Sequence, residues 1–298
     1  MNTKLMLVFI VLMSISCSSS DTTDSVPFLT DTTVVYKSIT GIDENLTSLD
    51  IYTLPNSKTL RPVVIWVHGG AWAIGDKLNK MDKKVPFFRN LDYVFVSVNY
   101  RLSPFPYELT NNSRIKHPDH ITDVADAIQW VYKNIELYGG DKTNIAVLGH
   151  SAGAHLVALM GTNQALLSSR NINTDHIKGI GSFDTQAYDV SKAIDLLTES
   201  DLYINAFSDD ETVQEDASPY FQIDNSSNIT AHWLLTERGE QIRKDLLNDF
   251  IVKLETKNVD ITKIDANGYT HADINDLIGN TSNTLISDAI ETFLRESF

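Results

Sequence analysis

The feature that most constrains the fold of this chain is the pentapeptide Gly149-His150-Ser151-Ala152-Gly153 together with its flanks. It follows the apolar, β-branched run Ile145–Leu148 and precedes the apolar run Ala154–Leu159. This order predicts a strand, a sharp turn and a helix, with the serine at the turn. Both glycines suit such a turn, because the backbone there passes too close to its neighbours for a side chain. The pattern indicates a serine at the top of a sheet, at the N-terminus of a helix.

The rest of the chain has the pattern of one large α/β domain. From residue 34 onward, short β-branched runs alternate with longer stretches of helical period, which is typical of a mostly parallel sheet covered by helices. The predicted strands are Val34–Ile39, Thr47–Tyr52, Val63–His68, Val94–Asn99, Ile145–Leu148, Ile177–Ser182, His232–Thr236 and Val259–Asp265. Helices are predicted at His120–Ile135, Leu246–Leu254 and Leu285–Leu294. We therefore expect one domain over residues 34–298, an eight-stranded, mostly parallel sheet with helices on both faces.

Residues 189–220 interrupt this alternation. The segment contains two short, acidic stretches of helical character between two predicted strands. It forms either a small lid or an ordinary surface connection.

Composition excludes several classes of protein. With 42% hydrophobic residues the chain has ordinary globular usage. Lys and Arg number 24 against 39 Asp and Glu, for a net charge of −15, which is the wrong sign for neutralising the phosphates of a nucleic acid. Its single cysteine permits no internal disulfide and no cysteine-based metal cage. We therefore expect no nucleic-acid partner, no metal and no organic cofactor.

The N-terminus has the layout of an export signal. In residues 1–16, Lys4 precedes the apolar run Leu5–Met13, which is much shorter than the roughly 20 residues of a membrane-spanning helix. Cys17 and a polar linker to residue 33 follow. This arrangement resembles the bacterial lipoprotein signal, although Ser14 stands where that signal usually has Leu. The resemblance implies an exported, cell-envelope protein held at a membrane only by a lipid on Cys17; a cleaved secretory signal is the alternative.

A second motif, His68-Gly69-Gly70-Ala71-Trp72, closes the apolar run Pro62–Val67. Acyl transfer places negative charge on the former carbonyl oxygen, and fixed backbone N–H groups stabilise that charge. A glycine pair after a strand allows the backbone to curl and direct such donors toward the serine. The N–H groups of Gly70, Ala71 and Ala152 are therefore the candidate oxyanion hole, and a plain Gly-Gly turn is the alternative.

A serine hydroxyl becomes a good nucleophile only when a base takes its proton. Of the eight histidines, His271 follows the last predicted strand on a glycine-containing loop, and we predict that it is this base. His68 and His150 belong to the two motifs, where we expect them to shape the glycine loop and pack beside the serine turn. We expect His155 to be a buried histidine of the following helix.

These motifs resemble the α/β-hydrolase superfamily over nearly all of residues 34–298. More narrowly, they resemble its H-G-G-x-W esterase branch, which includes hormone-sensitive-lipase-like and arylformamidase-like enzymes. The supporting local matches are Asn99-Tyr100-Arg101-Leu102-Ser103, the helical stretch Asp123–Trp130, Gly139-Gly140-Asp141 and Ser151–Leu156. The resemblance implies Ser151 as nucleophile, His271 as base, and Gly70, Ala71 and Ala152 as oxyanion donors. Ala71 stands where many relatives have a third glycine, which leaves its N–H intact.

The same resemblance implies that the acid of the triad follows the penultimate strand. The usual pattern there is Leu-Leu-x-Gly-x-x-Asp, and its alignment with Leu234–Glu240 places Glu240 at the acid. Because the glycine is displaced and the usual aspartate is absent, Glu237, Asp265 and an acid within Ser182–Asp189 remain open.

The sequence thus predicts a serine carboxylesterase that hydrolyses small to medium esters through an acyl-enzyme on Ser151. Two alternatives remain open. The same machinery suits an acetyl group on a polysaccharide or an aryl formamide. The irregular acid segment also fits an α/β-hydrolase that has lost catalysis and acts as a binding protein.

Overall fold

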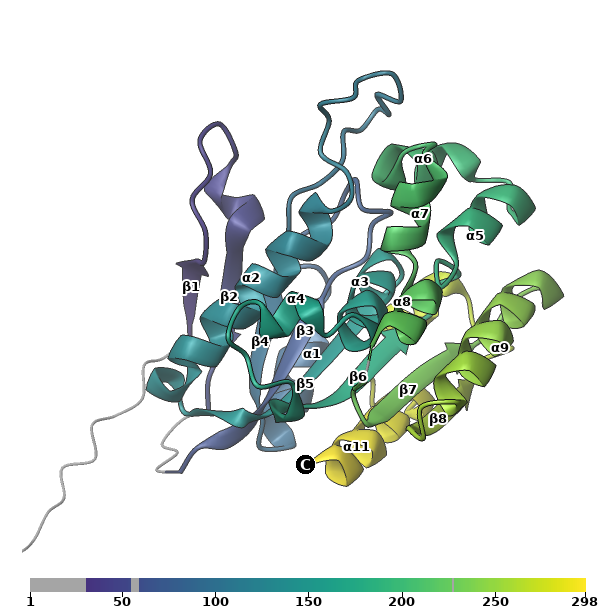
Figure 1. Cartoon of the computed structure of the whole chain (residues 1–298). Coiled ribbons are helices and arrows are strands. Elements are labelled where there is room, and N and C mark those ends of the chain that lie inside the picture. The colour runs from purple at the N-terminus through teal and green to yellow at the C-terminus, as the bar shows by residue number, and fades with distance from the viewer. Residues whose placement is uncertain (1–30, 55–58, 227) are drawn as a thin grey trace, which may run out of the picture.

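The computed structural model describes residues 31–54, 59–226 and 228–298 (Figure 1). The predicted signal peptide, Cys17 and most of the linker lie outside these residues. Within the described ranges, no helix has both the length and the apolar character needed to cross a membrane.

In the part of the chain that the structure describes, eight strands form one sheet, in the order β1-β2-β4-β3-β5-β6-β7-β8. Their bounds are β1 Thr32–Val35, β2 Ser48–Tyr52, β3 Arg61–Val67, β4 Val94–Val98, β5 Gly140–His150, β6 Ile177–Phe183, β7 His232–Glu237 and β8 Asp260–Asp265. β2 runs antiparallel to both β1 and β4, and all the other neighbouring pairs are parallel. The predicted eight-stranded, mostly parallel sheet is confirmed.

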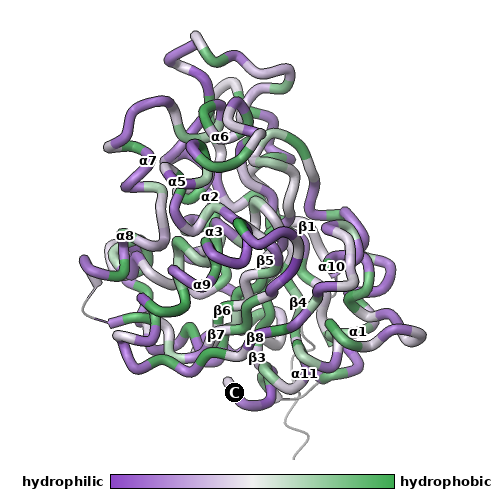
Figure 2. The backbone as a smooth tube through the Cα atoms, turned by 90° about the vertical axis from the view of Figure 1, so that its right-hand side faces the viewer, coloured by the Kyte–Doolittle hydropathy of each residue, from purple (hydrophilic) through white to green (hydrophobic). Residues whose placement is uncertain are grey.

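Helices cover both faces of the sheet, which gives the three layers visible in Figure 2. One face carries α2 (Asp119–Asn134), α3 (Ala152–Thr162), α4 (Ala165–Ser168), α8 (Pro219–Asn225) and α9 (Gln241–Glu255). The other carries α1 (Met81–Asn90), α10 (His271–Asp276) and α11 (Leu285–Ser297). Short 3-10 turns η1 (Glu44–Thr47), η2 (Ile135–Tyr138) and η3 (Thr174–His176) complete the connections.

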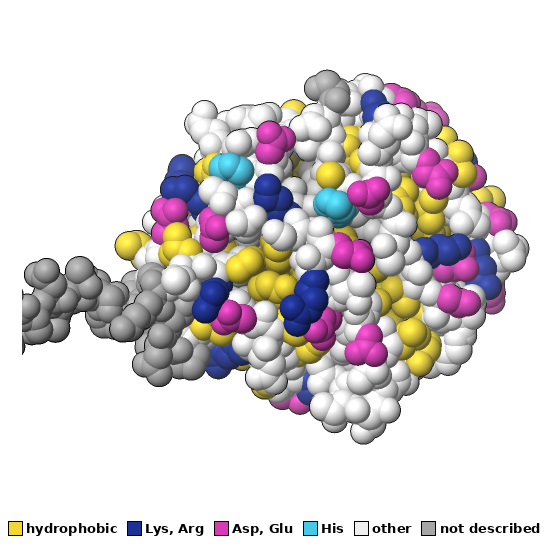
Figure 3. Space-filling view, turned by 90° about the horizontal axis from the view of Figure 1, so that it is seen from below, with side chains coloured by type: hydrophobic (Ala, Val, Ile, Leu, Met, Phe, Trp, Pro, Cys, Tyr) yellow, Lys and Arg dark blue, Asp and Glu magenta, His cyan; other side chains and the backbone are white. Residues whose placement is uncertain are grey.

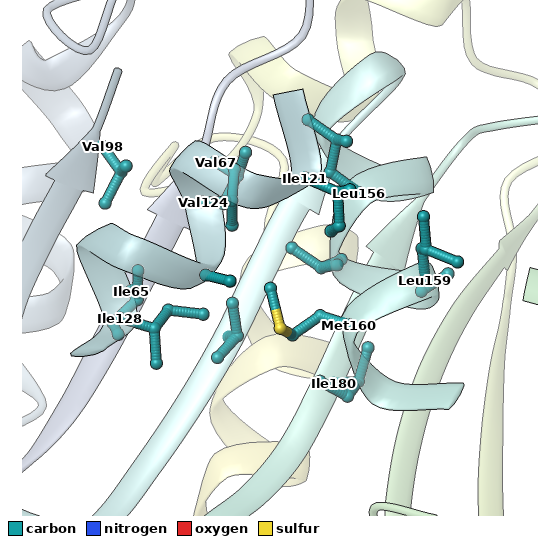
Figure 4. Packing of buried hydrophobic residues seen from close by; sticks show 14 of the residues in the cluster. Ile65, Val67, Val98, Ile121, Val124, Ile128, Leu156, Leu159, Met160 and Ile180 are labelled. Atoms are coloured by element: carbon teal, nitrogen blue, oxygen red, sulfur yellow. The ribbon is translucent and has the colours of Figure 1, made fainter. Parts of the chain in front are cut away.

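Side chains of the central strands are buried on both sides, as expected for a covered parallel sheet. On β3, Val63, Ile65 and Val67 belong to the core under α2 and α3, whereas Val64 and Trp66 belong to the core under α1 and α11. This alternation follows from the two-residue period of a strand. Figure 4 shows the first core, in which the labelled residues are Ile65, Val67, Val98, Ile121, Val124, Ile128, Leu156, Leu159, Met160 and Ile180.

The segment 189–220 contains more helix than the sequence predicts. In place of two helical stretches it forms α5 (Val190–Leu196), α6 (Ser200–Phe207) and α7 (Glu211–Ala217) and begins α8. Asp189 and Asp210 accept hydrogen bonds at the N-termini of α5 and α7, so these two acidic residues of the segment act as helix caps. α5, α6 and α7 lie together above the carboxyl end of the sheet (Figure 1).

On the face of the molecule shown in Figure 3, Lys and Arg side chains are interspersed among Asp and Glu side chains. Basic residues in this view do not gather into one continuous patch.

Candidate active site

Ser151 occupies the sharp turn between β5 and α3. Its backbone, with φ 58° and ψ −119°, lies in a region that residues with a side chain rarely adopt. A Cβ at Gly149 would lie 2.5 Å from the carbonyl oxygen of Gly153, and a Cβ at Gly153 would lie 2.1 Å from that of Val67. Both positions therefore require glycine. The N–H of Ser151 donates to the carbonyl oxygen of Phe183 at 2.9 Å, which ties the turn to the end of β6.

His271 stands at the start of α10, on the face of the sheet opposite to α3, and faces Ser151 at the carboxyl edge. Its Nε2 atom lies 2.9 Å from the Ser151 Oγ atom. His271 is the first residue of α10, and the N-cap Thr270 forms a capping box with Asp273. These reciprocal hydrogen bonds fix the start of the short helix and therefore the backbone that carries the imidazole.

The second ring nitrogen of His271, Nδ1, lies 2.5 Å from the Oδ2 atom of Asp184. Asp184 is the first residue after β6, and its side chain is only 3% exposed. Arg238 donates from Nε to its Oδ2 atom, and Arg243 donates from Nη2 to its Oδ1 atom at 2.7 Å. Burial acts to raise the pKa of Asp184. The hydrogen bond from His271, the charge of that histidine and the two guanidinium groups outweigh it, and the pKa is held well below its usual range.

The prediction of Glu240 as the acidic partner of His271 is wrong. Glu240 is exposed at the N-cap of α9, and the position at His271 Nδ1 is taken by Asp184. Of the other acids considered, Glu237 pairs with Lys263 at 2.7 Å, and Asp265 is exposed and accepts from the N–H of Asn267 at 3.1 Å. The connection after β7 delivers arginines to the site in place of a carboxylate.

Asp184 lies within the range Ser182–Asp189 that the sequence leaves open, and one signal points to it. It is separated by one residue from the predicted strand Ile177–Ser182, and the carboxyl ends of parallel strands meet at one edge of the sheet. β6 is the neighbour of β5, the strand that ends at the serine turn. An acid at the end of β6 is therefore as close to Ser151 as the topology allows.

The glycine loop after β3 lies against the serine turn. A Cβ at Gly69 would lie 2.9 Å from the Ser151 Cβ atom. The next residues, Gly70, Ala71 and Trp72, have φ values of 123°, 54° and 57°. Three successive positive φ values curl the backbone tightly, and a Cβ at Gly70 would meet the carbonyl oxygen of Ile74 at 2.0 Å. Gly70, Ala71 and Ala152 line the same cavity as Ser151.

Asn99 and Tyr100, which follow β4, contact the segment after the glycine loop and the start of the loop, respectively. Asn99 donates to Asp76 at 3.0 Å and to the carbonyl oxygen of Asn45 at 2.9 Å, and it accepts from the N–H of Lys77 at 2.6 Å. The ring of Tyr100 stacks on His68 at 4.6 Å, and its hydroxyl donates to the His68 carbonyl oxygen at 3.1 Å. His68 is thus a buried support of the loop, as expected from its place in the motif.

The site opens into a cavity of about 790 Å³. Trp72 lines this cavity and packs against Tyr203 at 5.7 Å, Phe207 at 4.7 Å and His155 at 5.3 Å between ring centroids. Leu202 and Tyr203 of α6 line the cavity. The segment 189–220 therefore supplies one wall of the site.

His150 lies between the serine turn and the base. Its Nε2 atom is 2.9 Å from the backbone carbonyl oxygen of His271, and the two rings are 4.5 Å apart. Burial, with the charge of His271 as the next cause, lowers the pKa of His150 to about 3. A neutral His150 therefore donates its Nε2–H to the backbone of the base.

The expected burial of His155 is confirmed, and its Nε2 atom lies 2.8 Å from the carbonyl oxygen of Ala217.

His150, Asp184 and His271 offer ligand atoms within 4.8 Å of one another, a set that could hold a metal ion. Their other contacts oppose this use. Asp184 already faces the guanidinium groups of Arg238 and Arg243, whose positive charges repel a cation, and the His150 Nε2 atom is engaged by a carbonyl oxygen. The donor set fits a proton relay better than a cation site.

The fold and the site together define an α/β-hydrolase. The chain belongs to the BD-FAE family, which it matches over residues 49–232. Among curated proteins, esterase LipQ of Mycobacterium tuberculosis is 43% identical over 121 residues, which are 40% of this chain and 26% of that protein. Para-nitrobenzyl esterase of Bacillus subtilis is 34% identical over 106 residues, 35% of this chain and 22% of that protein. The matched segments thus span about a quarter of the length of these relatives.

Solved structures share the fold over most of the chain. A truncated carbohydrate esterase from gut microbiota superimposes with a TM-score of 0.69 at 18% identity, covering 91% of this chain and 97% of that one. Thermogutta terrifontis esterase 2 phosphonylated by sarin superimposes with a TM-score of 0.70 at 17% identity, covering 90% of this chain and 95% of that one.

Proposed function

We propose that this protein hydrolyses carboxylic esters through an acyl-enzyme on Ser151. The observation that carries the proposal is the relay in which the two ring nitrogens of His271 face Ser151 Oγ and Asp184 Oδ2. With Nδ1–H donated to the carboxylate, Nε2 presents its lone pair to the serine hydroxyl. The relatives named as esterases support the same reaction.

In the acylation step, Ser151 Oγ attacks the ester carbonyl carbon while His271 Nε2 takes the hydroxyl proton. Negative charge develops on the former carbonyl oxygen, where the N–H groups of Gly70, Ala71 and Ala152 stabilise it. When the intermediate collapses, the bond to the alcohol oxygen breaks and His271 returns the proton to that oxygen. In deacylation, water loses a proton to His271 and attacks the acyl carbon. The bond from that carbon to Ser151 Oγ then breaks, His271 returns the proton to Oγ, and the carboxylic acid is released.

Asp184 serves the relay without receiving the proton. Because its pKa is held well below the usual range, it is ionised throughout the pH range in which an esterase works. Its negative charge keeps the proton of neutral His271 on Nδ1 and stabilises the imidazolium formed during attack. Asp184 also supplies the carboxylate whose apparent absence motivated the alternative of a purely binding protein.

The substrate class is a small or medium carboxylic ester. A cavity of about 790 Å³ is within the range of small-molecule sites and has room for both sides of such an ester. Because one protein of similar fold is named a carbohydrate esterase, acetylated and other carbohydrate esters belong in the substrate panel, beside p-nitrophenyl esters and an aryl formamide.

The test is hydrolysis of p-nitrophenyl acetate by the wild-type protein and by Ser151→Ala. We expect no turnover by the variant and an unchanged melting temperature, and an organophosphonate probe should attach to Ser151 in the wild type alone. Ser169→Ala, a change of an exposed serine, is the matched control. Turnover by Ser151→Ala at the wild-type rate, or attachment of the probe to another residue, would falsify the proposal.

We also propose that the protein is exported and anchored by a lipid on Cys17. The support comes from sequence alone: the charged start, the short apolar run and the single cysteine before a polar linker. In a bacterial host, the wild type should incorporate labelled palmitate and fractionate with membranes, whereas Cys17→Ser should do neither. Labelling of the serine variant would contradict the proposed anchor.

A further inference from the structure

The carboxylate of Asp184 is flanked by two positive charges although its only proposed task is to hold one imidazole. Arg238 stands just after β7, and Arg243 lies in the first turn of α9. Both side chains are largely buried, with 13% and 19% exposure, and both line the cavity. Neither arginine takes part in the proton transfers between Ser151 and His271.

We propose that Arg238 and Arg243 are positioning residues, which keep Asp184 ionised and fix its orientation toward His271. The inference rests on the proposed function, because it assigns a task within the same relay. It also accounts for the displaced acid: Arg238 after β7 and Arg243 in the first turn of α9 contribute the charges that allow an aspartate just after β6 to orient the base.

The geometry of the carboxylate supports the assignment. The Oδ1 atom accepts from Arg243, and the Oδ2 atom accepts from Arg238 and His271. Because both oxygens are engaged from different directions, the carboxylate cannot rotate away from Nδ1 without breaking a charged hydrogen bond. Such bonds are shorter and roughly twice as strong as neutral ones.

The sheet topology places the residues after β7, beginning with Arg238, beside Asp184. β7 pairs with β6 in parallel, and Ser182 is in register with Leu235. The connection after β7 therefore begins beside Asp184. The charges are needed because a carboxylate with 3% exposure is poorly hydrated, and burial alone favours its protonated form. A protonated carboxyl would carry no negative charge to stabilise the imidazolium.

A purely structural ion pair is the competing explanation, and the pH dependence of catalysis separates the two. In the double variant Arg238→Gln/Arg243→Gln, we expect kcat for p-nitrophenyl acetate to fall on the order of tenfold to a hundredfold, with KM little changed. We expect the acid limb of the kcat profile to move to higher pH, because without the guanidiniums the His271–Asp184 pair takes up a proton more readily. A structural role alone would lower the melting temperature and leave this limb where it is.

Two further variants test charge and shape separately. The double variant Arg238→Lys/Arg243→Lys keeps both charges, and we expect it to recover most of the lost kcat and the wild-type acid limb. Guanidinium chloride at millimolar concentration should partly restore the glutamine variant, whereas an equal concentration of sodium chloride should not. Lys263→Gln removes one positive charge from the neighbouring β8, where Lys263 pairs with Glu237, and serves as the matched control with unchanged kinetics.

A spectroscopic measurement keeps the inference testable without turnover. In the wild type, the Nδ1–H proton of His271 should give a far-downfield proton resonance from its hydrogen bond to Asp184. We expect this resonance to be lost or displaced in the glutamine variant and kept in the lysine variant. If the wild type hydrolyses no ester and takes no organophosphonate, the proposed function fails, and the resonance still decides the role of the arginines. A folded glutamine variant with wild-type kcat, acid limb and resonance would overturn the inference.

Discussion

The Nε2 atom of His150 lies 2.9 Å from the backbone carbonyl oxygen of His271, and the two imidazole rings are tilted by 37° at a centroid distance of 4.5 Å. The residue before the proposed nucleophile thus holds the backbone of the proposed base. Because the pKa of His150 is lowered to about 3, it stays neutral and donates this hydrogen bond at any pH at which the enzyme works.

Removal of this donor should slow catalysis. We expect His150→Phe to reduce kcat by roughly tenfold or more with a small change in KM, because the start of α10 loses an anchor and the base shifts relative to Ser151. His150→Gln retains an N–H of similar reach and should lose less. Steady-state kinetics on p-nitrophenyl acetate would measure both. His232→Gln, at the opposite end of the sheet, is the control, and equal kinetics for His150→Phe and wild type would refute the assigned role.

The identity of the acid gives a second comparison. Asp184→Asn should reduce kcat on the order of a thousandfold to ten-thousandfold, because an amide no longer holds the histidine in the required protonation state. Glu240→Gln should leave kcat within about twofold of wild type, since surface changes away from the site have small effects. A larger loss of kcat in the Glu240 variant than in the Asp184 variant would show that Glu240, the acid that the family pattern suggests, is the partner of His271.

The curled glycine loop makes a third prediction. Gly70→Ala would place a Cβ 2.0 Å from the carbonyl oxygen of Ile74 at a φ of 123°. We expect a stability loss of about 1–3 kcal/mol from backbone strain, and roughly a hundredfold lower kcat from misdirected N–H donors. Urea unfolding and kinetics would measure the two effects. Gly268→Ala, where no atom lies within 4 Å of the new Cβ, should change neither, and similar behaviour of the two variants would show that the loop tolerates movement.

Lys84 is buried under the helix that carries the base. Its Nζ atom donates to the carbonyl oxygens of Lys80 at 3.2 Å and Asn275 at 3.3 Å, and it lies 5.0 Å above the ring of Trp66. Burial lowers its pKa to about 7, although the nearby Asp276 and Asp82 act in the opposite direction. An unfolded lysine titrates near 10.4, so between about pH 7 and pH 10 the unfolded chain binds more protons at this residue than the folded protein.

The sign of the pH dependence follows directly. Below about pH 7, the buried charge of Lys84 lowers the free energy of unfolding by its full amount. This destabilisation becomes smaller as the pH rises to about 10. The unfolding free energy of the wild type should therefore rise over this range relative to that of Lys84→Met, by about 1.4 kcal/mol for each unit of pKa difference at most. Urea unfolding of both proteins at several pH values would measure the difference. A constant difference between pH 7 and pH 10 would mean that Lys84 titrates as it does in water.

Much of the fold could be predicted from sequence because it depends on local pattern. Each of the eight predicted strands overlaps an observed one, and the three predicted helices are present. The first strand lies earlier than predicted, because β1 spans Thr32–Val35 and residues 37–39 are not in a strand. The apolar pattern did not predict where β5 begins, because it placed the start of this strand at Ile145. The strand begins at Gly140, and the polar residues 141–144 interrupt the apolar pattern because they lie at the partly exposed end of the sheet.

From sequence, only those site residues could be predicted whose local sequence context identifies them. Ser151 stands in a local motif, and His271 follows the last strand on a glycine-containing loop. Asp184 was harder to find because many acids follow strands, and the choice among them depends on which strands are neighbours. The partners Arg238 and Arg243 were beyond reach from sequence. A charged residue in a loop resembles any solvated residue until the register of β7 on β6 places it beside a buried carboxylate.

The hydrogen bond from the Ser151 N–H to the Phe183 carbonyl oxygen joins the turns that carry Ser151 and Asp184. Two of the three relay members are therefore tied to each other at the ends of the neighbouring strands β5 and β6, whereas His271 approaches from the start of α10. The base is held by contacts at α10: the capping box of Thr270 and Asp273, the hydrogen bond from Lys84 to Asn275, and the hydrogen bond from His150 to the His271 carbonyl oxygen. The approach of the base to the serine therefore depends on how α10 is held against the sheet that carries the other two residues.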